Sequence, residues 1–104
     1  MMKYYIYKIF EINNVDIFYI GSTNNFNKRK SMHKKNTNNK VSKKYKLKLY
    51  KYIRECGGWD NFDMVIYETI ETENRRDILK REHDIVNELK PQLNTNFNIC
   101  KGLK

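Results

Sequence analysis

The feature that most constrains the fold is an alternation of aromatic and β-branched residues in two short segments, 4–11 and 16–21. Side chains in a β-strand point to opposite faces in turn, so this period of two predicts a pair of half-buried strands. Asn13 and Asn14 lie between the segments, and asparagine tolerates the positive φ that tight turns require. The beginning of the chain is therefore predicted to be a β-hairpin.

The middle of the chain predicts two helices. A helix over 26–35 can be capped by Thr23 or Asn24, and the Asn-rich segment 36–40 is predicted to be a loop. A second helix over 42–56 ends at Gly57 and Gly58, since glycine takes the left-handed conformation at a helix end without strain. Its apolar residues recur at helical spacing: Tyr45, Leu49, Tyr52, Ile53 and Cys56.

The last third predicts one more strand and one more helix. Alternation returns over 62–68, which places Phe62, Met64 and Ile66 on one face. A long helix is predicted to start at Thr72 and to end near residue 89, before Pro91. The resulting order is β-β-α-α-β-α: an α+β fold with a small three-stranded antiparallel sheet flanked by three helices.

The size and the residue types narrow the class of protein. With 104 residues and neither linker nor repeat, residues 1–104 are expected to form a single domain. The two cysteines make neither a disulfide framework nor a zinc-binding spacing. No apolar run approaches a membrane span, and residues 1–7 lack a signal-peptide core. We therefore expect an intracellular protein that does not enter a membrane.

Charge is distributed very unevenly. The net charge is +9, and residues 17–54 contain no Asp or Glu. A block of one sign makes a strong positive potential, and the commonest polyanions are nucleic acids. The alternative is a solvated lysine-rich surface, and composition does not separate DNA from RNA or from an anionic membrane. The candidate nucleic-acid contacts are Lys8, Lys28, Lys30, Lys34, Lys35, Lys43, Lys44 and Lys48.

The last predicted helix carries a carboxylate among its apolar positions. Its buried face is predicted to consist of Ile78, Leu79, Ile85, Val86 and Leu89. Glu82 lies at the position where the helical spacing of this stripe would place another apolar residue. A carboxylate buried there loses its hydration and needs a positive partner. Two interpretations stay open: a salt bridge to a lysine at the edge of the stripe, or a ligand for a hard divalent cation.

Arg29 and His33 form the second informative pair. Their spacing of four residues puts both on one face of the first predicted helix. Arginine can grip a phosphate with two hydrogen bonds, and histidine can transfer protons near neutral pH. Taken alone, the pair is more typical of a solvated basic helix.

Five motifs in order resemble those of the GIY-YIG nuclease superfamily. The segments 5–7 (Tyr-Ile-Tyr) and 19–21 (Tyr-Ile-Gly) are similar to its paired signature, and Arg29 and His33 follow at the spacing of its second motif. Segments 57–62, 80–82 and 93–98 resemble its later motifs. Two positions depart: Tyr5 replaces the first glycine of the signature, which leaves the strand packing there open, and Ser22 stands where some repair-type relatives have lysine.

The resemblance implies a metal-dependent DNA endonuclease that hydrolyses phosphodiester bonds. Tyr7 and Tyr19 would be the active-site phenols, with Tyr7 preferred as the base and Lys8 and Arg29 favouring its phenolate. Glu82 would be the sole protein ligand of one Mg²⁺ or Mn²⁺ ion. The implied catalytic residues are Tyr7, Tyr19, Arg29, His33, Glu82 and Asn98, with Asn94 and Asn96 as alternatives for the last.

The roles implied for Tyr7 and Tyr19 restrict the register of the hairpin, because both phenols must lie on one face of the sheet. A two-residue turn at Asn13 and Asn14 would pair Tyr7 with Ile20 and send Tyr19 to the other face of the sheet. We therefore predict either a loop of odd length over 12–14 or a β-bulge, with a register that pairs Tyr7 with Tyr19.

Several alternatives stay open at this stage. The same fold could be a catalytically silent DNA-binding module, whereas a basic RNA-binding domain is disfavoured because no stacking platform is recognisable. A monomer and a homodimer are both compatible with the sequence. The small size and the Asn-, Lys- and Tyr-rich composition favour a viral, phage or mobile-element origin, although restriction and repair roles are compatible too.

Overall fold

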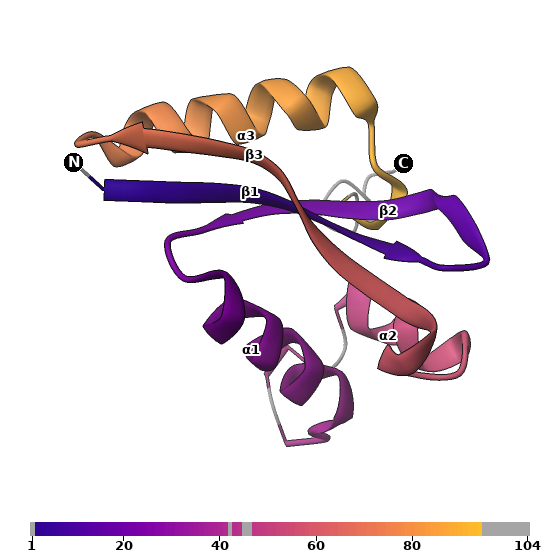
Figure 1. Ribbon diagram of the computed structural model, residues 1–104. Coiled ribbons are helices and arrows are strands. Elements are labelled where there is room, and N and C mark those ends of the chain that lie inside the picture. Colours follow the sequence, from indigo (N-terminus) through magenta and orange to yellow (C-terminus); the bar gives the residue numbers. More distant parts are fainter. Residues whose placement is uncertain (1, 42, 45–46, 95–104) are drawn as a thin grey trace.

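The computed structural model describes residues 2–41, 43–44 and 47–94 (Figure 1). The elements in order are β1 (Met2–Glu11), β2 (Asn14–Thr23), α1 (Phe26–Asn38), α2 (Lys48–Glu55), β3 (Phe62–Thr72) and α3 (Arg75–Leu89). Two short 3₁₀ turns, η1 (Trp59–Asn61) and η2 (Gln92–Asn94), follow α2 and α3. The predicted order β-β-α-α-β-α and the α+β class are confirmed.

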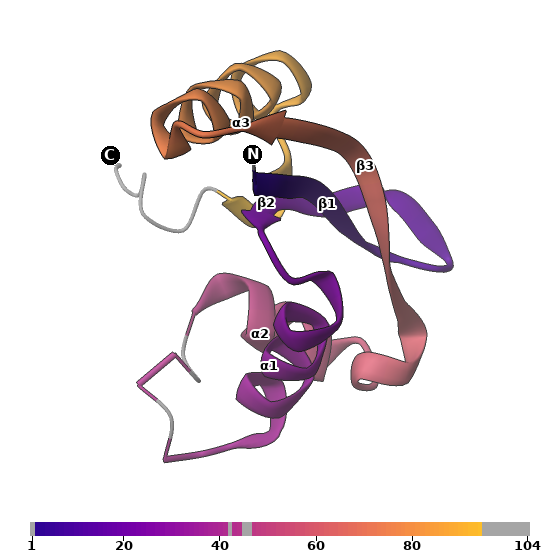
Figure 2. The same cartoon turned by 60° about the vertical axis from the view of Figure 1, so that its left-hand side comes forward.

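The three strands form one antiparallel sheet in the order β2-β1-β3. The helix α3 lies along one face of this sheet, and α1 and α2 lie together on the other (Figures 1 and 2). Because β1 is central, it is covered on both faces, and its neighbouring residues Ile6 and Tyr7 are both fully buried although they point in opposite directions. The strand β2 is left as an edge.

Two apolar clusters hold the three layers together. The larger lies between the sheet and α2, and its buried members are Tyr7, Ile9, Leu49, Tyr50, Ile53, Phe62, Met64 and Leu93. The smaller lies under α3 and is built on Ile6, Ile20 and Ile85. Each cluster draws on alternate residues of the same strands, so a one-residue slip in register would exchange the two faces and disrupt both.

The hairpin contains the predicted irregularity. The register shifts between Phe10 and Glu11, which marks a β-bulge, and Tyr7 and Tyr19 consequently lie on the same face of the sheet. The predicted pairing of Tyr7 with Tyr19 is wrong, since Tyr7 pairs with Gly21 and Tyr19 pairs with Ile9. The two phenols are diagonal neighbours across the strand pair, with ring centroids 6.3 Å apart.

Several helix boundaries differ from the prediction. The cap of α1 is Asn25, whose side chain accepts from the Lys28 amide, and the helix continues to Asn38 through residues expected to form a loop. The helix α2 begins only at Lys48 rather than at residue 42. Ser42 and Tyr45, which the prediction placed in this helix, lie outside the described residues.

The strand β3 and the helix α3 are also displaced from their predicted limits. The strand runs on to Thr72, so Asn74 rather than Thr72 caps α3. Ile66 pairs with Tyr7 in the register that joins Met64 to Ile9, so it keeps the predicted face, but it is 47% exposed. The register with β1 shifts just beyond it, between Ile6 and Tyr7. Leu79 is 51% exposed and does not belong to the buried stripe of α3.

The stop signals behave as predicted. Gly57 and Gly58 follow α2 with φ of 102° and 110°, values that other residues rarely adopt. The helix α3 ends at Lys90 in the left-handed conformation, just before the buried Pro91. In the part of the chain that the structure describes, no helix has the length and apolar character needed to cross a membrane.

Candidate active site

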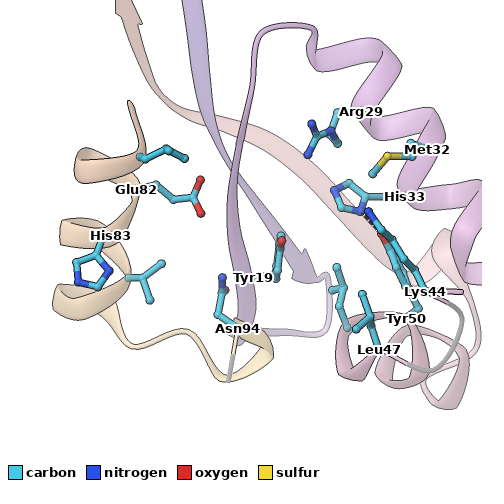
Figure 3. A pocket seen from close by; sticks show the side chains of 13 residues that line it. Tyr19, Arg29, Met32, His33, Lys44, Leu47, Tyr50, Glu82, His83 and Asn94 are labelled. Atoms are coloured by element: carbon cyan, nitrogen blue, oxygen red, sulfur yellow. Dashed lines mark hydrogen bonds between the residues drawn. The ribbon is translucent and has the colours of Figure 1, made fainter. Parts of the chain in front are cut away.

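A cleft of about 440 Å³ passes the free edge of β2 (Figure 3). The helix α3 borders it on one side, while α1, α2 and the segment between them border it on the other. Four of the predicted site residues line it: Tyr19 from β2, Arg29 and His33 from α1, and Glu82 from α3. Lys44, Tyr50 and Asn94 line the same cleft.

Glu82 enters this cleft half-buried, from the side of α3 that faces β2. Its Oε1 atom accepts a hydrogen bond from the Ser22 hydroxyl of β2. None of the described residues forms a hydrogen bond or salt bridge with Oε2. The carboxylate is therefore held by a neutral donor rather than by the lysine that one interpretation of the sequence required.

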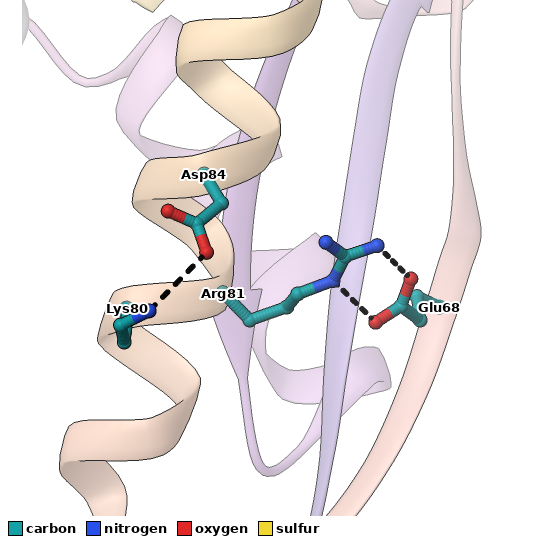
Figure 4. Close-up of polar contacts among 4 residues, drawn as sticks. All are labelled: Glu68, Lys80, Arg81 and Asp84. Carbon is teal, nitrogen blue, oxygen red and sulfur yellow. Dashed lines mark hydrogen bonds and ion pairs between the residues drawn. The ribbon is translucent and has the colours of Figure 1, made fainter.

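The preceding residue fixes the orientation of α3 (Figure 4). Arg81 donates two hydrogen bonds to the Glu68 carboxylate of β3, at 2.8 Å from Nε and 2.9 Å from the terminal nitrogen. Successive helical residues point about 100° apart, so an Arg81 side chain anchored on β3 directs Glu82 towards β2. The other ion pair on this helix, Lys80 with Asp84 at 3.8 Å, lies on its exposed side.

Tyr7 lies behind the cleft wall rather than in it. Its hydroxyl is 2.7 Å from Nε2 of His33, and Nδ1 of the same ring is 2.8 Å from the Tyr50 hydroxyl. The side chains of all three residues are nearly or fully buried. His33 thus connects the fully buried phenol of β1 with the cleft surface.

The glycine in the second half of the strand signature makes room for this arrangement. A Cβ atom on Gly21 would lie 2.5 Å from the Tyr7 hydroxyl and 3.0 Å from the Tyr19 ring. The first distance is shorter than real contacts and the second is tighter than most, so the two phenols can lie side by side at this point only because residue 21 has no side chain.

Burial determines the ionisation of the site. Burial, reinforced by Tyr19, raises the pKa of Tyr7 above its ordinary value, although the Arg29 guanidinium opposes this through its charge and a hydrogen bond. Burial, with the Glu82 charge, raises the pKa of Tyr19 to about 12. Burial, with the charges of Arg29 and Lys44, lowers the pKa of His33 to about 4. At neutral pH the two phenols and the imidazole are therefore uncharged.

The expectation that Lys8 favours a Tyr7 phenolate is wrong. Adjacent strand residues face opposite ways, so Lys8 projects from the face opposite to Tyr7. Its ammonium lies over the Phe18 ring, 4.4 Å from the centroid. Lys8 is thus separated by the sheet from the face that Tyr7 shares with α1 and α2.

Among the other predicted nucleic-acid contacts, only Lys44 lines the cleft. Lys28, Lys34 and Lys35 are exposed on α1, and Lys30 is half-exposed there. Lys43 and Lys48 are exposed at either end of the segment that leads into α2. These positive side chains give α1 and the segment before α2 a basic surface.

Asn98 and Asn96 lie outside the described residues, so the structure places only the third candidate, Asn94. Its side-chain oxygen accepts from the Ile20 amide at 2.7 Å, and its side-chain nitrogen donates to the Ile20 carbonyl at 2.8 Å. Asn94 thus pairs with the backbone of the edge strand at the point where the cleft passes it.

The donor set suits one kind of metal ion. Among the described residues, no group of three or more His, Cys, Asp or Glu side chains could hold a metal. A lone carboxylate fits a hard divalent cation such as Mg²⁺, which keeps several waters and takes further oxygens from a substrate phosphate. It does not fit a structural zinc site, which needs four protein ligands.

Sequence reasoning missed Tyr50 and Ser22. Tyr50 precedes Ile53 by three residues, so a wider apolar stripe on α2 would have included it, but nothing in the spacing indicates its bond to His33. Ser22 stands out only as a departure from repair-type relatives, and its bond to Glu82 joins residues that are sixty positions apart.

The chain is similar to known proteins in sequence and in fold. A protein-family model described as the GIY-YIG catalytic domain matches residues 3–96. The chain belongs to the GIY-YIG family. This membership confirms the family resemblance and the expectation of a nuclease. Comparison of the sequence with curated proteins gives no match.

A solved structure supports the assignment to the GIY-YIG family. The chain is similar to a mutant of the catalytic domain of the intron endonuclease I-TevI, with 28% identity, a TM-score of 0.69 and 86% of each chain covered. At the position where the GIY-YIG signature has its first glycine, Tyr5 pairs with Thr23 on β2 and with Thr69 on β3, and the register with β3 shifts just after it, between Ile6 and Tyr7.

Proposed function

We propose that this GIY-YIG nuclease is a DNA endonuclease that hydrolyses a phosphodiester in the cleft beside β2, with one Mg²⁺ or Mn²⁺ ion on Glu82. The observation that carries the proposal is that side chains from a strand and from two helices on opposite faces of the sheet line one cleft. They are Tyr19, Arg29, His33 and Glu82. A basic surface on α1 surrounds this cleft and suits a polyanion.

Arg29 is the proposed phosphate clamp. It lines the cleft next to the Tyr7 hydroxyl, and a guanidinium can give two parallel hydrogen bonds to phosphoryl oxygens. Lys44 adds a second positive charge on the same wall. Together they would draw the scissile phosphate towards the phenols and away from bulk solvent.

Glu82 is the residue that would hold the metal ion, through the carboxylate oxygen that Ser22 leaves open. When bound, a divalent ion supplies Lewis acidity and neutralises charge on the phosphoryl oxygens. The Ser22 hydroxyl and the Arg81–Glu68 pair hold the carboxylate in place without cancelling its charge. Such outer contacts are what a single-ligand metal site needs in order to be well oriented.

We assign the base to Tyr7 rather than to Tyr19. The Tyr7 hydroxyl is bonded to an uncharged imidazole, so it can pass its own hydrogen to His33 while it takes a proton from the attacking water. No described residue offers the Tyr19 hydroxyl a hydrogen-bonded base. Tyr19 would instead orient the water from the cleft wall.

Cleavage of supercoiled plasmid tests the proposal. The wild-type protein with Mg²⁺ or Mn²⁺ should nick the plasmid, and a chelator should stop the reaction. A single cleft cuts one strand per encounter, so open circles should precede linear molecules. Glu82→Ala should lose activity, whereas Glu88→Ala, which removes an exposed carboxylate of the same helix, should retain it.

Two outcomes would contradict the proposal. Nicking by Glu82→Ala at the wild-type rate would remove Glu82 from the metal site. Plasmid binding without nicking, over a range of metal ions and salt concentrations, would instead indicate a catalytically silent DNA-binding module.

A further inference from the structure

Tyr50 extends the contact between Tyr7 and His33 into a buried chain of three side chains. The Tyr7 oxygen is 2.7 Å from Nε2 of His33. The Tyr50 oxygen is 2.8 Å from Nδ1 of the same ring (Figure 3). The relative exposures of Tyr7, His33 and Tyr50 are 0%, 3% and 2%. A ring enclosed in this way holds one orientation, and each nitrogen has a single hydroxyl partner.

The direction of the first hydrogen bond follows from the burial of Tyr7. Its side chain is fully buried, so its hydrogen needs an acceptor inside the protein, and the nearby Arg29 guanidinium carries only donors. Tyr7 does not line the cleft, and among the described residues Nε2 of His33 is the acceptor within reach. Tyr7 therefore donates, and Nε2 carries no hydrogen.

The direction of the second bond follows from the first. An uncharged imidazole has one N–H, so the hydrogen of His33 is on Nδ1 and is donated to the Tyr50 oxygen. Asn36 donates to the same oxygen at 3.5 Å. The hydrogen of Tyr50 is then free to point into the cleft, which Tyr50 lines. The opposite tautomer would bury the Tyr7 hydrogen without an acceptor.

We propose that Tyr50 is a positioning residue: its oxygen holds His33 as the Nδ1–H tautomer and so keeps Nε2 open for the Tyr7 hydrogen. Its role in cleavage rests on the nuclease function proposed above. The tautomer itself is a property of the resting protein and does not depend on cleavage.

The proton transfers balance around this chain. For cleavage the attacking water must reach the Tyr7 oxygen, which is buried in the resting protein, through the cleft wall beside Arg29. The water gives a proton to that oxygen as its own oxygen bonds to phosphorus, and the hydrogen of Tyr7 moves to Nε2. The P–O bond to the leaving oxygen breaks, and that oxygen keeps the electron pair and takes a proton from solvent. His33 is then an imidazolium whose Nδ1–H still points at Tyr50. After the product leaves, Nε2 returns its proton to Tyr7, which releases one to solvent.

The surroundings of His33 favour an uncharged ring before substrate binds. Arg29 on the same helix and Lys44 on the next segment are positive, while the sheet and α2 present only uncharged phenols. A phosphate bound to Arg29 would offset one of these charges and make the imidazolium easier to form.

Nitrogen NMR of protein with ¹⁵N-labelled histidine tests the proposal, because the two ring nitrogens respond differently to protonation. The variant His33→Gln identifies the signals of His33. We expect protonated Nδ1 and bare Nε2 in the wild type. The matched variants are Tyr50→Phe and Tyr52→Phe, since Tyr52 lies on the same helix but donates to Glu11 at 2.8 Å.

Tyr50→Phe leaves the Nδ1 hydrogen without an acceptor, so it should shift part of His33 to the Nε2–H form. It should also lower kcat about 10-fold to 100-fold, the range found for outer partners of metal-ligating histidines. Its KM and its unfolding midpoint should change little. Tyr52→Phe should keep both the tautomer and kcat. If kcat falls only in the variant whose tautomer changes, and its unfolding midpoint stays the same, the loss comes from the position of His33 and not from a general loss of structure.

A wild-type spectrum with the hydrogen on Nε2 would overturn the proposal, even if Tyr50→Phe failed to fold. Full retention of the Nδ1–H tautomer and of kcat in Tyr50→Phe would overturn it as well. If the tautomer is as expected but the protein cuts no nucleic acid, the proposed function fails while the tautomer assignment stands.

Discussion

At the scale of single residues, the site depends on Gly21, because any side chain at this position would collide with Tyr7. Gly21→Ala would place a methyl group 2.5 Å from the Tyr7 hydroxyl, and both phenols would have to move. We expect a loss of about 1–3 kcal/mol in the free energy of unfolding, as for overpacked cores, and a much larger loss of cleavage. Urea unfolding and plasmid nicking measure the two effects.

Gly58→Ala is the control for that substitution. It strains a backbone with φ of 110°, but no atom lies within 4 Å of the added methyl group. It should therefore destabilise the fold while each folded molecule keeps its activity. Equal activity of the folded Gly21→Ala and Gly58→Ala proteins would show that residue 21 does not position the phenols.

The burial of His33 predicts a dependence of stability on pH. Its pKa is lowered from 6.5 to about 4 in the folded state, so between these values the unfolded chain binds a proton that the folded chain does not. Stability is fully present above pH 6.5 and falls as the pH is lowered towards about 4, by up to about 3 kcal/mol.

Urea unfolding at several pH values across this window measures the effect. His33→Gln is the comparison, because it removes this titration and leaves the carboxylates and His83 unchanged. The difference in unfolding free energy between the two proteins should shrink as the pH falls. A constant difference would mean that His33 titrates alike in the folded and unfolded chains.

At the scale of elements, the edge strand β2 determines whether the cleft exists. Asn94 satisfies both backbone groups of Ile20 from outside the sheet. Asn94→Ala would leave a buried amide and carbonyl without partners, at about 1–3 kcal/mol for each group. We expect lower stability in urea and faster hydrogen exchange of the Ile20 amide, whereas Asn87→Ala, on an exposed part of α3, should change neither. If Asn94→Ala leaves the hydrogen exchange of the Ile20 amide unchanged, Asn94 does not hold the edge of β2.

The elements themselves follow from local patterns. Alternation and helical spacing predicted every strand and helix, and Gly57, Gly58 and Pro91 predicted two of the helix ends. The cap of α1 and the start of α3 were missed because neighbouring Thr and Asn residues compete as caps, and for α1 local sequence does not decide among Thr23, Asn24 and Asn25. The end of α1 was missed because its last residues lie in an Asn-rich segment, which is typical of a loop. Pairing with β1 extends β3 to Thr72, which local patterns do not record.

The site was predictable only in part, for a related reason. Arg29, His33 and Glu82 stand out because their charge or position breaks a helical pattern. Their meeting at one edge depends on the bulge between Phe10 and Glu11 and on α3 crossing the opposite face. Tyr50 resembles any other aromatic residue of the core until its distance to His33 is known.

At the scale of the whole molecule, the two sides of the cleft differ in charge. The lysines of α1 and of the segment before α2 make one side basic, whereas α3, on the other side, has four Arg or Lys and four Asp or Glu residues and no net charge. A duplex would therefore bind from the α1 side, with the scissile phosphate beside Glu82. Phosphate contacts release counterions, so binding should weaken steeply as salt rises.

If about five phosphates are neutralised, the log–log slope of affinity against salt should be roughly −4 to −5. Lys34→Ala should reduce its magnitude by about 1. Lys80→Ala should not, because Lys80 pairs with Asp84 on the exposed side of α3. Fluorescence anisotropy of a labelled duplex at several salt concentrations measures the slope. Equal slopes for the two variants would place DNA elsewhere.

A crystal structure of Tyr7→Phe with a short DNA duplex and Mn²⁺ tests the central claim most directly. This substitution removes the proposed base but leaves the cleft, Arg29 and Glu82 intact. We predict an anomalous manganese peak on the Glu82 carboxylate and a backbone phosphate between that ion and Arg29. Manganese bound away from Glu82, or DNA bound to another face of the molecule, would contradict the account.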